Sequence, residues 1–494
     1  MEKGASGILE STMPPTTCPA WNCFSTGKNP GKIGIFGFVQ LSEEGIPEIV
    51  NPTMCDSPTI WEILSEYGKR VGVLNVPGTY PPARVNGFMV SGFLTPRSKK
   101  DFTFPTGLRD ELDKVVNGYE IEPLTFNPES MRGGNKAYLK EIERVYLKRL
   151  VATKYLMKRF DWDFFMVVFR ATDYVQHFFW HYMDPKSPRY ESDRKYRDVI
   201  REWYARIDQA IGQISEIAGE DTFLIIMSDH GFGRFHSFFL INEWLRQQGF
   251  LKLIQEDRAV EPIDRSRMVT LRRFAFRIIG AGLIGRLAKI IPTSLLTRVT
   301  ILGMERQDID EIMSQVDWSK TKAFAISGLA GMIYLGLGGA GLRRSAKTGK
   351  DYEEIRDEIM NKLYRGIHAG KGSKVSVSAY KKEEIYDGKH LDKAPDILCR
   401  ISVDGAICNF YAGFSRGELW RPFTGWVTGT HAREGVWMIT GPGVRENIRI
   451  DAQITDLCPT ILRLLRVPIP PDMDGKILTQ AFSPTINAAH EDRP

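Results

Sequence analysis

Short apolar runs bounded by turn residues alternate with helical patterns along most of the chain. Runs that are apolar at nearly every position are typical of strands buried on both faces, whereas apolar residues at helical spacing predict helices. This alternation predicts an α/β fold whose parallel or mixed sheet is covered by helices on both faces. We expect strands at residues 70–75, 163–169, 222–227, 396–401 and 436–440, and helices at 58–68, 135–159, 190–219 and 352–364.

The segment 245–316 differs from the rest, because it is basic, helical in pattern and without strand-like runs. We interpret it as a helical insertion or cap, which leaves residues 1–244 and 317–494 as the α/β catalytic core. Two interpretations of its helices stay open: a helix lying on a membrane surface, or an ordinary helix packed on the core. No stretch has the ~20 uninterrupted apolar residues that a spanning helix requires, so we expect no transmembrane segment.

Composition narrows the class of protein. Of 494 residues, 43% are hydrophobic and 26% charged, which is typical of a folded globular protein. The 66 basic residues are nearly balanced by 60 acidic ones, and no long Lys/Arg run occurs, so we expect no nucleic-acid polymer as a partner. The six cysteines form no CxxC pair and the N-terminus has no apolar signal region, which predicts a reduced, cytoplasmic protein.

Candidate metal ligands follow the predicted strands, where ligands bind in α/β sheets. Asp173 and His177, in the motif DYVQH, lie four residues apart and therefore share one face of a helical turn, so both can reach one metal ion. Asp229 and His230 follow the run 222–227, and an adjacent pair can ligate only if the backbone bends sharply there. Gly231 permits such a bend.

A third motif, Thr-Gly-Thr-His ending at His431, lies in a Gly-rich loop before the run 436–440. Each motif alone is a weak signal, but the chain has only eight histidines, and three of them lie in such loops beside Asp or Gly. His236 is near enough to Asp229 in sequence to be a substrate or outer-sphere contact. We interpret the remaining histidines as structural or exposed: His181, His368, His390 and His490.

The candidate nucleophile is Thr17, in the stretch MPPTTCPAW. Pro19 suits the first turn of a helix and Gly27 suits its end, which places Thr17 near the cap. A hydroxyl at a helix N-terminus lies where free backbone N–H groups favour anions, and a metal ion would lower its pKa. The simpler interpretation is that Thr17 only caps the helix.

These motifs together resemble one family. The string PTTCPAWNCFSTGKNPGKIGI resembles the nucleophile segment of type I phosphodiesterases/nucleotide pyrophosphatases, in the alkaline-phosphatase superfamily, and DYVQH, SDHGF and GTHAREGVWMITGPG resemble its metal motifs in the same order. NVPGTYPPARVNGFMVSGFLTP and ITDLCPTILRLLRVPIPPDMDG resemble segments of its microbial cytosolic branch. The resemblance implies an alkaline-phosphatase-like fold, with a mostly parallel central sheet sandwiched by helices.

The resemblance also implies a site with two divalent metal ions, either zinc or, alternatively, manganese or iron. Thr17 would be the nucleophile and form a phospho-enzyme intermediate, and Lys28 or Lys32 would either hold phosphate or be solvated. The implied ligands are Asp173, His177 and His431 for one ion, and Asp229, His230 and Thr17 for the other.

The chain also departs from the family pattern. Members normally begin with a strand ending in a metal-ligating Asp upstream of the nucleophile, and we expect no strand before the nucleophile segment here. We therefore expect the sequence to start at an internal methionine. The alternative is a genuine short form, in which the sheet would lack a central strand and expose its edges.

These observations predict a metal-dependent hydrolase of phosphodiester or pyrophosphate bonds that acts on a small, nucleotide-like phosphorylated substrate. One alternative is a phosphomonoesterase or phosphomutase, since the same metal core serves those reactions. Another is a catalytically weakened binding or structural relative, because one metal-ligand Asp is missing.

Overall fold

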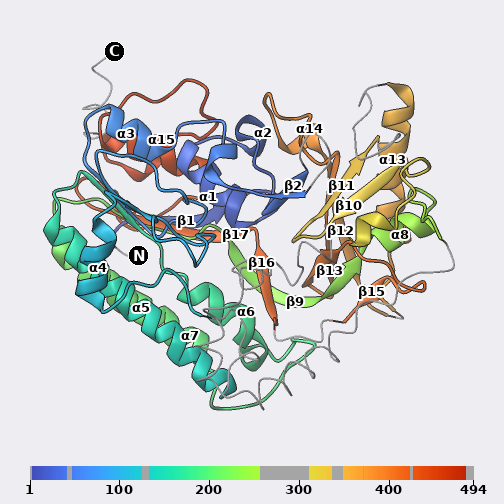
Figure 1. Ribbon diagram of the computed structural model, residues 1–494, viewed down its shortest axis with the longest axis horizontal. Helices are drawn as coiled ribbons and strands as arrows, with labels where there is room; N and C mark the ends of the chain where they lie inside the picture. Colours follow the sequence, from blue (N-terminus) through green and yellow to red (C-terminus); the bar gives the residue numbers. More distant parts are fainter. Residues whose placement is uncertain are drawn as a thin grey trace.

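The computed structural model describes residues 3–41, 47–124, 133–255, 311–336, 349–370, 372–422 and 427–484. Its strands form three larger sheets and one two-stranded ribbon, with helices packed around them (Figure 1). The helices are α1 (Thr17–Thr26), α2 (Pro30–Ile33), α3 (Ile60–Glu66), α4 (Leu108–Val116), α5 (Gly134–Arg159), α6 (Ala171–Met183), α7 (Val199–Ala218), α8 (Ile241–Gln247), α13 (Lys350–Gly366), α14 (Lys382–Ile385) and α15 (Leu457–Leu464).

Two sheets make up the part of the molecule that contains the N-terminus. The first has the order β18-β1-β17-β8, with β19 beside β1, and the second has the order β6-β5-β4-β7. Their strands are β1 (Ala5–Glu10), β8 (Leu224–Met227), β17 (Glu434–Thr440), β18 (Ile448–Arg449) and β19 (Ala452–Gln453), then β4 (Val71–Leu74), β5 (Gly87–Val90), β6 (Thr103–Phe104) and β7 (Phe164–Val167).

The third sheet lies beside them and has the order β10-β11-β13-β14-β9-β15, with β12 on β13 and β16 on β9. The ribbon pairs β2 (Val39–Leu41) with β3 (Pro47–Ile49). The strands of the third sheet are β9 (Gly231–Leu240), β10 (Ala323–Ile326), β11 (Gly331–Leu335), β12 (Val375–Lys381), β13 (Ile397–Val403), β14 (Ala406–Tyr411), β15 (Trp420–Arg421) and β16 (Gly429–Ala432).

The sheets are mixed, so the expectation of a mostly parallel central sheet is wrong. β4 runs parallel to β5 and β7, but β17 runs antiparallel to both β1 and β8. In the third sheet, a two-residue turn at Asp404 and Gly405, with φ of 50° and 75°, joins β13 to β14. A turn this short forces its two strands to be antiparallel, and its positive φ angles suit Asp-Gly.

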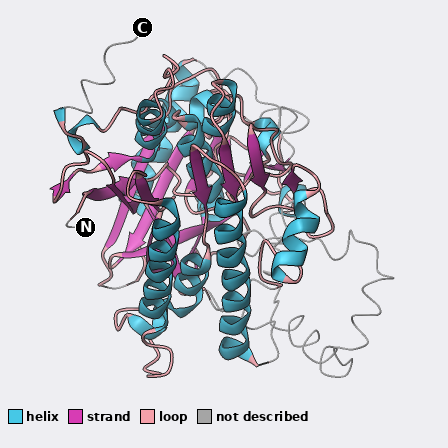
Figure 2. Cartoon of the chain, turned by 90° about the vertical axis from the view of Figure 1, so that its left-hand side faces the viewer, coloured by secondary structure: helices cyan, strands magenta, loops and turns pink. Residues whose placement is uncertain are grey.

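Helices cover β4 on both faces, as its continuous apolar run predicts. Val71 and Val73 pack in one core cluster with residues of α1, α3 and α15. Leu74 packs in a different cluster with residues of α4 and α5. Figures 1 and 2 show these two groups of helices on opposite sides of the strands.

All five predicted strands and all four predicted helices are present. The bounds differ by a few residues in most cases, and the largest difference is in the predicted helix 190–219, which begins at Val199 as α7. Residues 190–198 form coil and turns instead, and one turn is closed by the Asp193 carboxylate, which accepts from the Lys195 N–H at 2.9 Å.

A strand does precede the nucleophile segment, so the expectation of none is wrong. β1 pairs antiparallel with β17 over its whole length and parallel with β18 and β19 on its other side. It ends at Glu10, whose carboxylate forms an ion pair with Arg433 (3.0 Å). The alternating pattern of GASGILEST was too weak to predict a strand, because two of its residues are glycines.

Two of the strands that lead into the motifs stand at sheet edges. β7 and β8 each end the strand order of their sheet. Every residue of both strands is only half-buried, although both are apolar. β7 leads to α6 and β8 leads to Asp229, so the two edges carry the motifs that hold the site.

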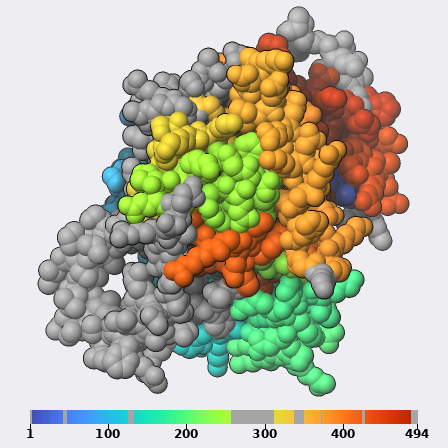
Figure 3. Space-filling model, turned by 90° about the vertical axis from the view of Figure 1, so that its right-hand side faces the viewer, coloured from blue at the N-terminus to red at the C-terminus, as the bar shows by residue number. Residues whose placement is uncertain are grey.

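Most of the predicted insertion 245–316 lies outside the described residues, and its assignment as a cap stays a prediction. Its described ends meet at a β-bridge between Leu253 and Val316 and pack in the core cluster of the third sheet. On the face in Figure 3, α8 and the segment after 311 lie beside α13. No helix among the described residues is long and apolar enough to cross a membrane. The six cysteines are free.

Candidate metal centre

Three histidines are held in the same way. Nδ1 of His177 lies 2.9 Å from the Gly429 carbonyl, and Nδ1 of His431 lies 3.0 Å from the Pro15 carbonyl. Nδ1 of His230 lies 3.1 Å from the carbonyl of the next residue. A carbonyl oxygen can only accept, so each Nδ1 carries a proton, and in the neutral ring each Nε2 then has the lone pair. Anchoring of this kind orients a histidine as a metal ligand.

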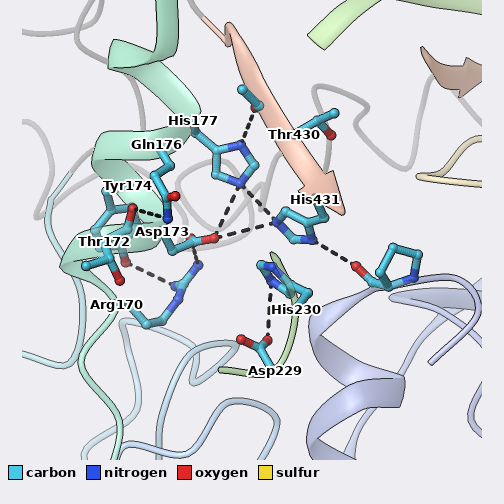
Figure 4. Close-up of polar contacts among 12 residues, drawn as sticks. Arg170, Thr172, Asp173, Tyr174, Gln176, His177, Asp229, His230, Thr430 and His431 are labelled. Atoms are coloured by element: carbon cyan, nitrogen blue, oxygen red, sulfur yellow. Dashed lines mark hydrogen bonds and ion pairs between the residues drawn. The ribbon is translucent and has the colours of Figure 1, made fainter. Parts of the chain in front are cut away.

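The lone pairs of two of these histidines converge on a carboxylate (Figure 4). Nε2 of His177 and Nε2 of His431 are 3.1 Å apart, and they lie 3.5 Å and 3.6 Å from Oδ1 of Asp173. Lone pairs that face one another at this distance repel unless a cation lies between them. Because imidazole and carboxylate are ligands of Zn²⁺ and similar ions, this donor set fits a divalent metal.

The third histidine joins the same group. The ring of His230 stacks on that of His431 with centroids 3.4 Å apart, and its Nε2 lies 3.3 Å from Oδ2 of Asp229. Asp173, His230 and His431 each offer a ligand atom within 4.8 Å of the others, in the one such group found among the described residues. His230 therefore lies against Asp229, its partner in one implied ligand set, and also against the group formed by Asp173 and His431.

Helix α6 and strand β16 carry three of these candidate ligands and determine where their side chains lie. Asp173 and His177 lie one turn apart on α6, as the i, i+4 spacing predicts. His431, expected in a loop, lies instead on β16, where it pairs with Phe232 of β9. The Gly-rich stretch around it is compact because α6 is close: a Cβ on Gly429 would lie 2.3 Å from the Gln176 carbonyl oxygen.

Gly231 serves a purpose other than the predicted bend. It begins β9, and a Cβ there would lie 2.1 Å from the carbonyl oxygen of Glu434 on β17. Glycine is therefore required for the close approach of two backbones rather than for a positive φ. This approach brings the Asp229–His230 turn against the strand that follows His431.

Thr17 is the first residue of α1 and is buried. Two residues before it, the Pro15 carbonyl accepts from Nδ1 of His431, which links the nucleophile segment directly to the histidine group. Ser11 donates to the backbone carbonyl of Asp229 at 2.5 Å, a second link between the segment and the site. Thr17 therefore starts a helix that borders the candidate centre.

The other predicted site residues contact different partners. His236 lies on β9, where Nδ1 is 2.7 Å from the Ser237 hydroxyl. Lys28 forms an ion pair with Asp472 (2.5 Å), and Lys32 forms one with Asp474 (2.5 Å). Both lysines therefore contact the loop after α15.

Burial and neighbouring charges set the electrostatics of the centre. Burial opposes ionisation of Asp173, but His177 and His431, when protonated on Nε2, together with Arg170 hold the pKa of its carboxyl well below its usual range. Burial raises the pKa of Asp229, and the nearby Asp173 raises it further. Burial beside His230 lowers the pKa of His431 to about 3, which keeps its Nε2 lone pair available at neutral pH.

Phe232 and the pair of Arg170 and Glu122 also lie at the site, although the sequence motifs assigned them no role. Phe232 forms one wall, with its ring centroid 4.8 Å from that of His177 and 5.2 Å from that of His431. Arg170 and Glu122 form a buried ion pair behind Asp173. Phe232 directly follows the DHG motif, which was the one available sequence signal for it.

The sequence itself matches a known family. Residues 1–283, more than half of the chain, match the family described as type I phosphodiesterase / nucleotide pyrophosphatase. The chain belongs to this family. Membership in this phosphodiesterase/pyrophosphatase family, and so in the alkaline-phosphatase superfamily, agrees with the resemblance in the motifs.

Solved structures of two family members share the fold. Murine ectonucleotide pyrophosphatase / phosphodiesterase 5 superposes with a TM-score of 0.52 at 13% identity, over 98% of this chain and 92% of that one. The human protein of the same name gives a TM-score of 0.50, also at 13% identity, with the same shares covered. No match was found among curated protein sequences.

Proposed function

We propose that this phosphodiesterase-family protein hydrolyses phosphodiester or pyrophosphate bonds in small, nucleotide-like substrates. The observation that carries the proposal is the convergence of two anchored Nε2 lone pairs on one oxygen of Asp173, at 3.5 Å and 3.6 Å. Family membership supplies the reaction class.

We propose two divalent ions, with zinc preferred and manganese or iron as alternatives. Their ligands would be the residues that the sequence motifs imply. Bound divalent ions neutralise charge on phosphate oxygens and lower the pKa of a coordinated hydroxyl. Asp173, His177 and His431 would hold one ion, and Asp229, His230 and Thr17 the other. The lowered pKa of His431 supports its ligand role, since a protonated imidazole cannot ligate.

Thr17 is the proposed nucleophile. Its hydroxyl oxygen would form a bond to phosphorus as the bond to the departing alcohol or nucleotide breaks, and water would then displace it from the phospho-enzyme. The start of α1 suits this role, because the first N–H groups of a helix have no partners within the helix and favour an anion. Burial of Thr17 keeps bulk water from its hydroxyl.

The test is hydrolysis of bis-p-nitrophenyl phosphate in Zn²⁺ or Mn²⁺ by the wild type and by Thr17→Ala. We expect Thr17→Ala to lower kcat by about 10³-fold or more, since a nucleophile is lost. Thr17→Ser should keep measurable turnover. Attack on the diester releases one p-nitrophenol, so the covalent group at position 17, seen by mass spectrometry after an acid quench, should be p-nitrophenyl phosphoryl. The matched control is Thr26→Ala, which removes a buried hydroxyl at the other end of α1 and should change kcat by only a few-fold.

The alternatives predict different outcomes in the same assay. Faster turnover of p-nitrophenyl phosphate than of the diester would indicate a phosphomonoesterase. Metal binding without turnover of either ester would indicate a binding or structural relative, and wild-type turnover by Thr17→Ala would overturn the nucleophile.

We also propose that the protein works in the cytoplasm and belongs to the microbial cytosolic branch of the family. Two observations support this proposal. Two sequence segments resemble the microbial cytosolic branch, and the six cysteines form no CxxC pair. Fractionation of the source cells with an antibody against the chain tests the compartment, and recovery in a membrane or secreted fraction would contradict it.

A further inference from the structure

Behind the candidate centre, a buried arginine holds the carboxylate that the histidines face. Arg170 directly precedes α6, and its side chain is 11% exposed. Its Nη2 donates to Oδ2 of Asp173 at 3.0 Å. In Figure 4, Arg170 approaches Asp173 from one side, whereas His177 and His431 lie on the other.

The two oxygens of Asp173 therefore have different partners. Oδ2 accepts from Arg170, while Oδ1 faces the two histidine Nε2 atoms. The charge-assisted bond from Arg170 occupies Oδ2 and fixes the plane of the carboxylate. Oδ1 is therefore the oxygen directed at the histidines and at a metal ion held with them.

Arg170 is itself fixed by segments distant in sequence. Nη1 donates to Oε2 of Glu122 at 2.8 Å and to the Tyr174 hydroxyl at 3.0 Å. The guanidinium carbon lies 3.9 Å from the ring centroid of Phe93, a stacking contact that leaves the planar donors free to bond at their edge. The hydrogen bonds at Nη1 and Nη2 and the stacking contact with Phe93 therefore fix the guanidinium in place.

Glu122 also affects the net charge beside Asp173. An unpaired Arg170 would cancel the charge of Asp173 and reduce its attraction for a cation. Glu122, with a side chain that is also 11% exposed, supplies a second negative charge on the far side of the guanidinium. The formal charges of these three groups sum to minus one, with Arg149 and Arg97 also near Glu122. Oδ1 of Asp173 is the part of this group that faces the histidines.

We infer that Arg170 is a positioning residue that makes Asp173 a one-oxygen metal ligand, and that Glu122 is its counter-charge. The inference deepens the proposed function, because it rests on the metal site proposed above. It predicts that loss of Arg170 frees Oδ2, so that the carboxylate rotates, binds the metal through two oxygens or loses its fixed orientation.

The experiment is titration of metal-free protein with Co²⁺, followed by visible absorption and calorimetry, in the Thr17→Ala background so that no turnover intervenes. Added ligand atoms weaken the visible bands of Co²⁺, so the spectrum reports coordination independently of activity. We expect Arg170→Met to lower the band intensity, because Oδ2 of Asp173 becomes free to bind as a second oxygen. Loss of the positive charge should not lower Co²⁺ affinity, so the spectrum carries the test. Arg170→Lys, which keeps the charge but has no planar fork, should keep an affinity near that of the parent protein and change the spectrum.

The matched control is Arg356 on α13, in the third-sheet part of the molecule (Figure 1). It is equally a buried arginine, paired with Glu353 (2.6 Å) and Glu383 (2.7 Å), and it lies over the Tyr352 ring at 4.6 Å. Arg356→Met should lower stability but leave the Co²⁺ affinity and spectrum unchanged.

The outcomes distinguish the positioning role of Arg170 from the metal site itself. A wild-type spectrum in Arg170→Met would overturn the positioning role and leave the metal site standing. No Co²⁺ binding by the parent protein would instead overturn the metal site itself. If Arg170→Met does not fold by circular dichroism, Glu122→Gln carries the test: we expect affinity to fall about 10-fold with the spectrum retained, and unchanged affinity would overturn the inference.

Discussion

Two buried clusters of charged side chains lie in different parts of the molecule and are built in opposite ways. At the candidate centre, Oδ1 of Asp173 and the Nε2 atoms of His177 and His431 are all acceptors that face one another. Beside the third sheet, Oδ1 of Asp396 accepts from Lys382 Nζ and from the Tyr352 hydroxyl, both at 2.8 Å, and Oδ2 accepts from the Leu335 N–H at 2.7 Å. In the first cluster the ligand atoms face one another, whereas in the second the carboxylate faces hydrogen-bond donors, one of them a cation.

This difference separates a binding site from a stabilising contact. Burying a charge costs free energy unless a partner of opposite charge is buried with it. Asp396, with a fully buried side chain, meets this condition within the chain. The histidine cluster meets it only in part, through Arg170, so it gains stability when a cation binds. Burial alone does not distinguish the two clusters, whereas the balance of donors and acceptors does.

The largest expected effect comes from removing the carboxylate at the centre. Asp173→Asn keeps the shape of the side chain but removes its charge, so we expect turnover of bis-p-nitrophenyl phosphate to fall by about 10³-fold, as several kcal/mol of metal-dependent stabilisation is lost. Metal at about 100 times its Kd should stabilise the wild type against urea by about 2.7 kcal/mol, and this gain should be nearly absent in the variant. Equal metal-induced gains in the two proteins would show that the cluster is not a metal centre.

The second cluster should respond in the opposite manner. Asp396→Ala leaves the buried Lys382 ammonium without its partner, so the free energy of unfolding should fall by about 3–5 kcal/mol. Asp396→Asn, which keeps an acceptor for Tyr352, should lose less. The measurement is urea unfolding in EDTA, with a Co²⁺ titration beside it. A changed Co²⁺ affinity would mean that the two clusters are coupled and that the contrast is false.

The difference between the two clusters also explains which of their residues could be predicted from the sequence. Asp173, His177, Asp229, His230 and His431 occur in short motifs, because a metal site needs several ligands with fixed local spacing. The Lys382–Asp396 pair has no such signature, since it depends only on α14 and β13 packing together. Arg170 and Glu122 were missed for the same reason, because they are 48 residues apart in sequence.

The fold was predictable in its elements and less so in its pairing. Apolar runs such as 222–227 identified β8, because hydrophobic periodicity is local. Strand direction is not local: β17 runs antiparallel to β8 although both are short apolar runs. The strand at Ala5–Glu10 was missed, since its burial depends on β17, more than 400 residues later in the chain.

The smallest of the expected effects concerns a histidine that lies outside both clusters. His181 lies on α6, one turn after His177, and its Nδ1 is 3.0 Å from the Thr428 hydroxyl. Burial, with a contribution from Arg189, lowers the pKa of its imidazole to about 4, from a usual value near 6.5. The folded state therefore favours the neutral ring.

The sign of the resulting pH dependence follows from this depressed pKa. Above pH 6.5 the ring is neutral in the folded and the unfolded chain, so its contribution to stability is complete. As the pH falls from 6.5 toward 4, the unfolded chain binds the proton first, and stability is lost. Between pH 7.5 and pH 4.5 we expect the metal-free wild type to lose about 2 kcal/mol more than His181→Gln, whose amide does not titrate. Urea unfolding at the two pH values measures the difference. An equal loss in both proteins would mean that His181 is protonated in the folded chain, with the Glu191 carboxylate, 3.8 Å from its Nε2, as the counter-charge. Burial would then not keep a histidine neutral, which removes one support for the contrast between the metal centre and its surroundings.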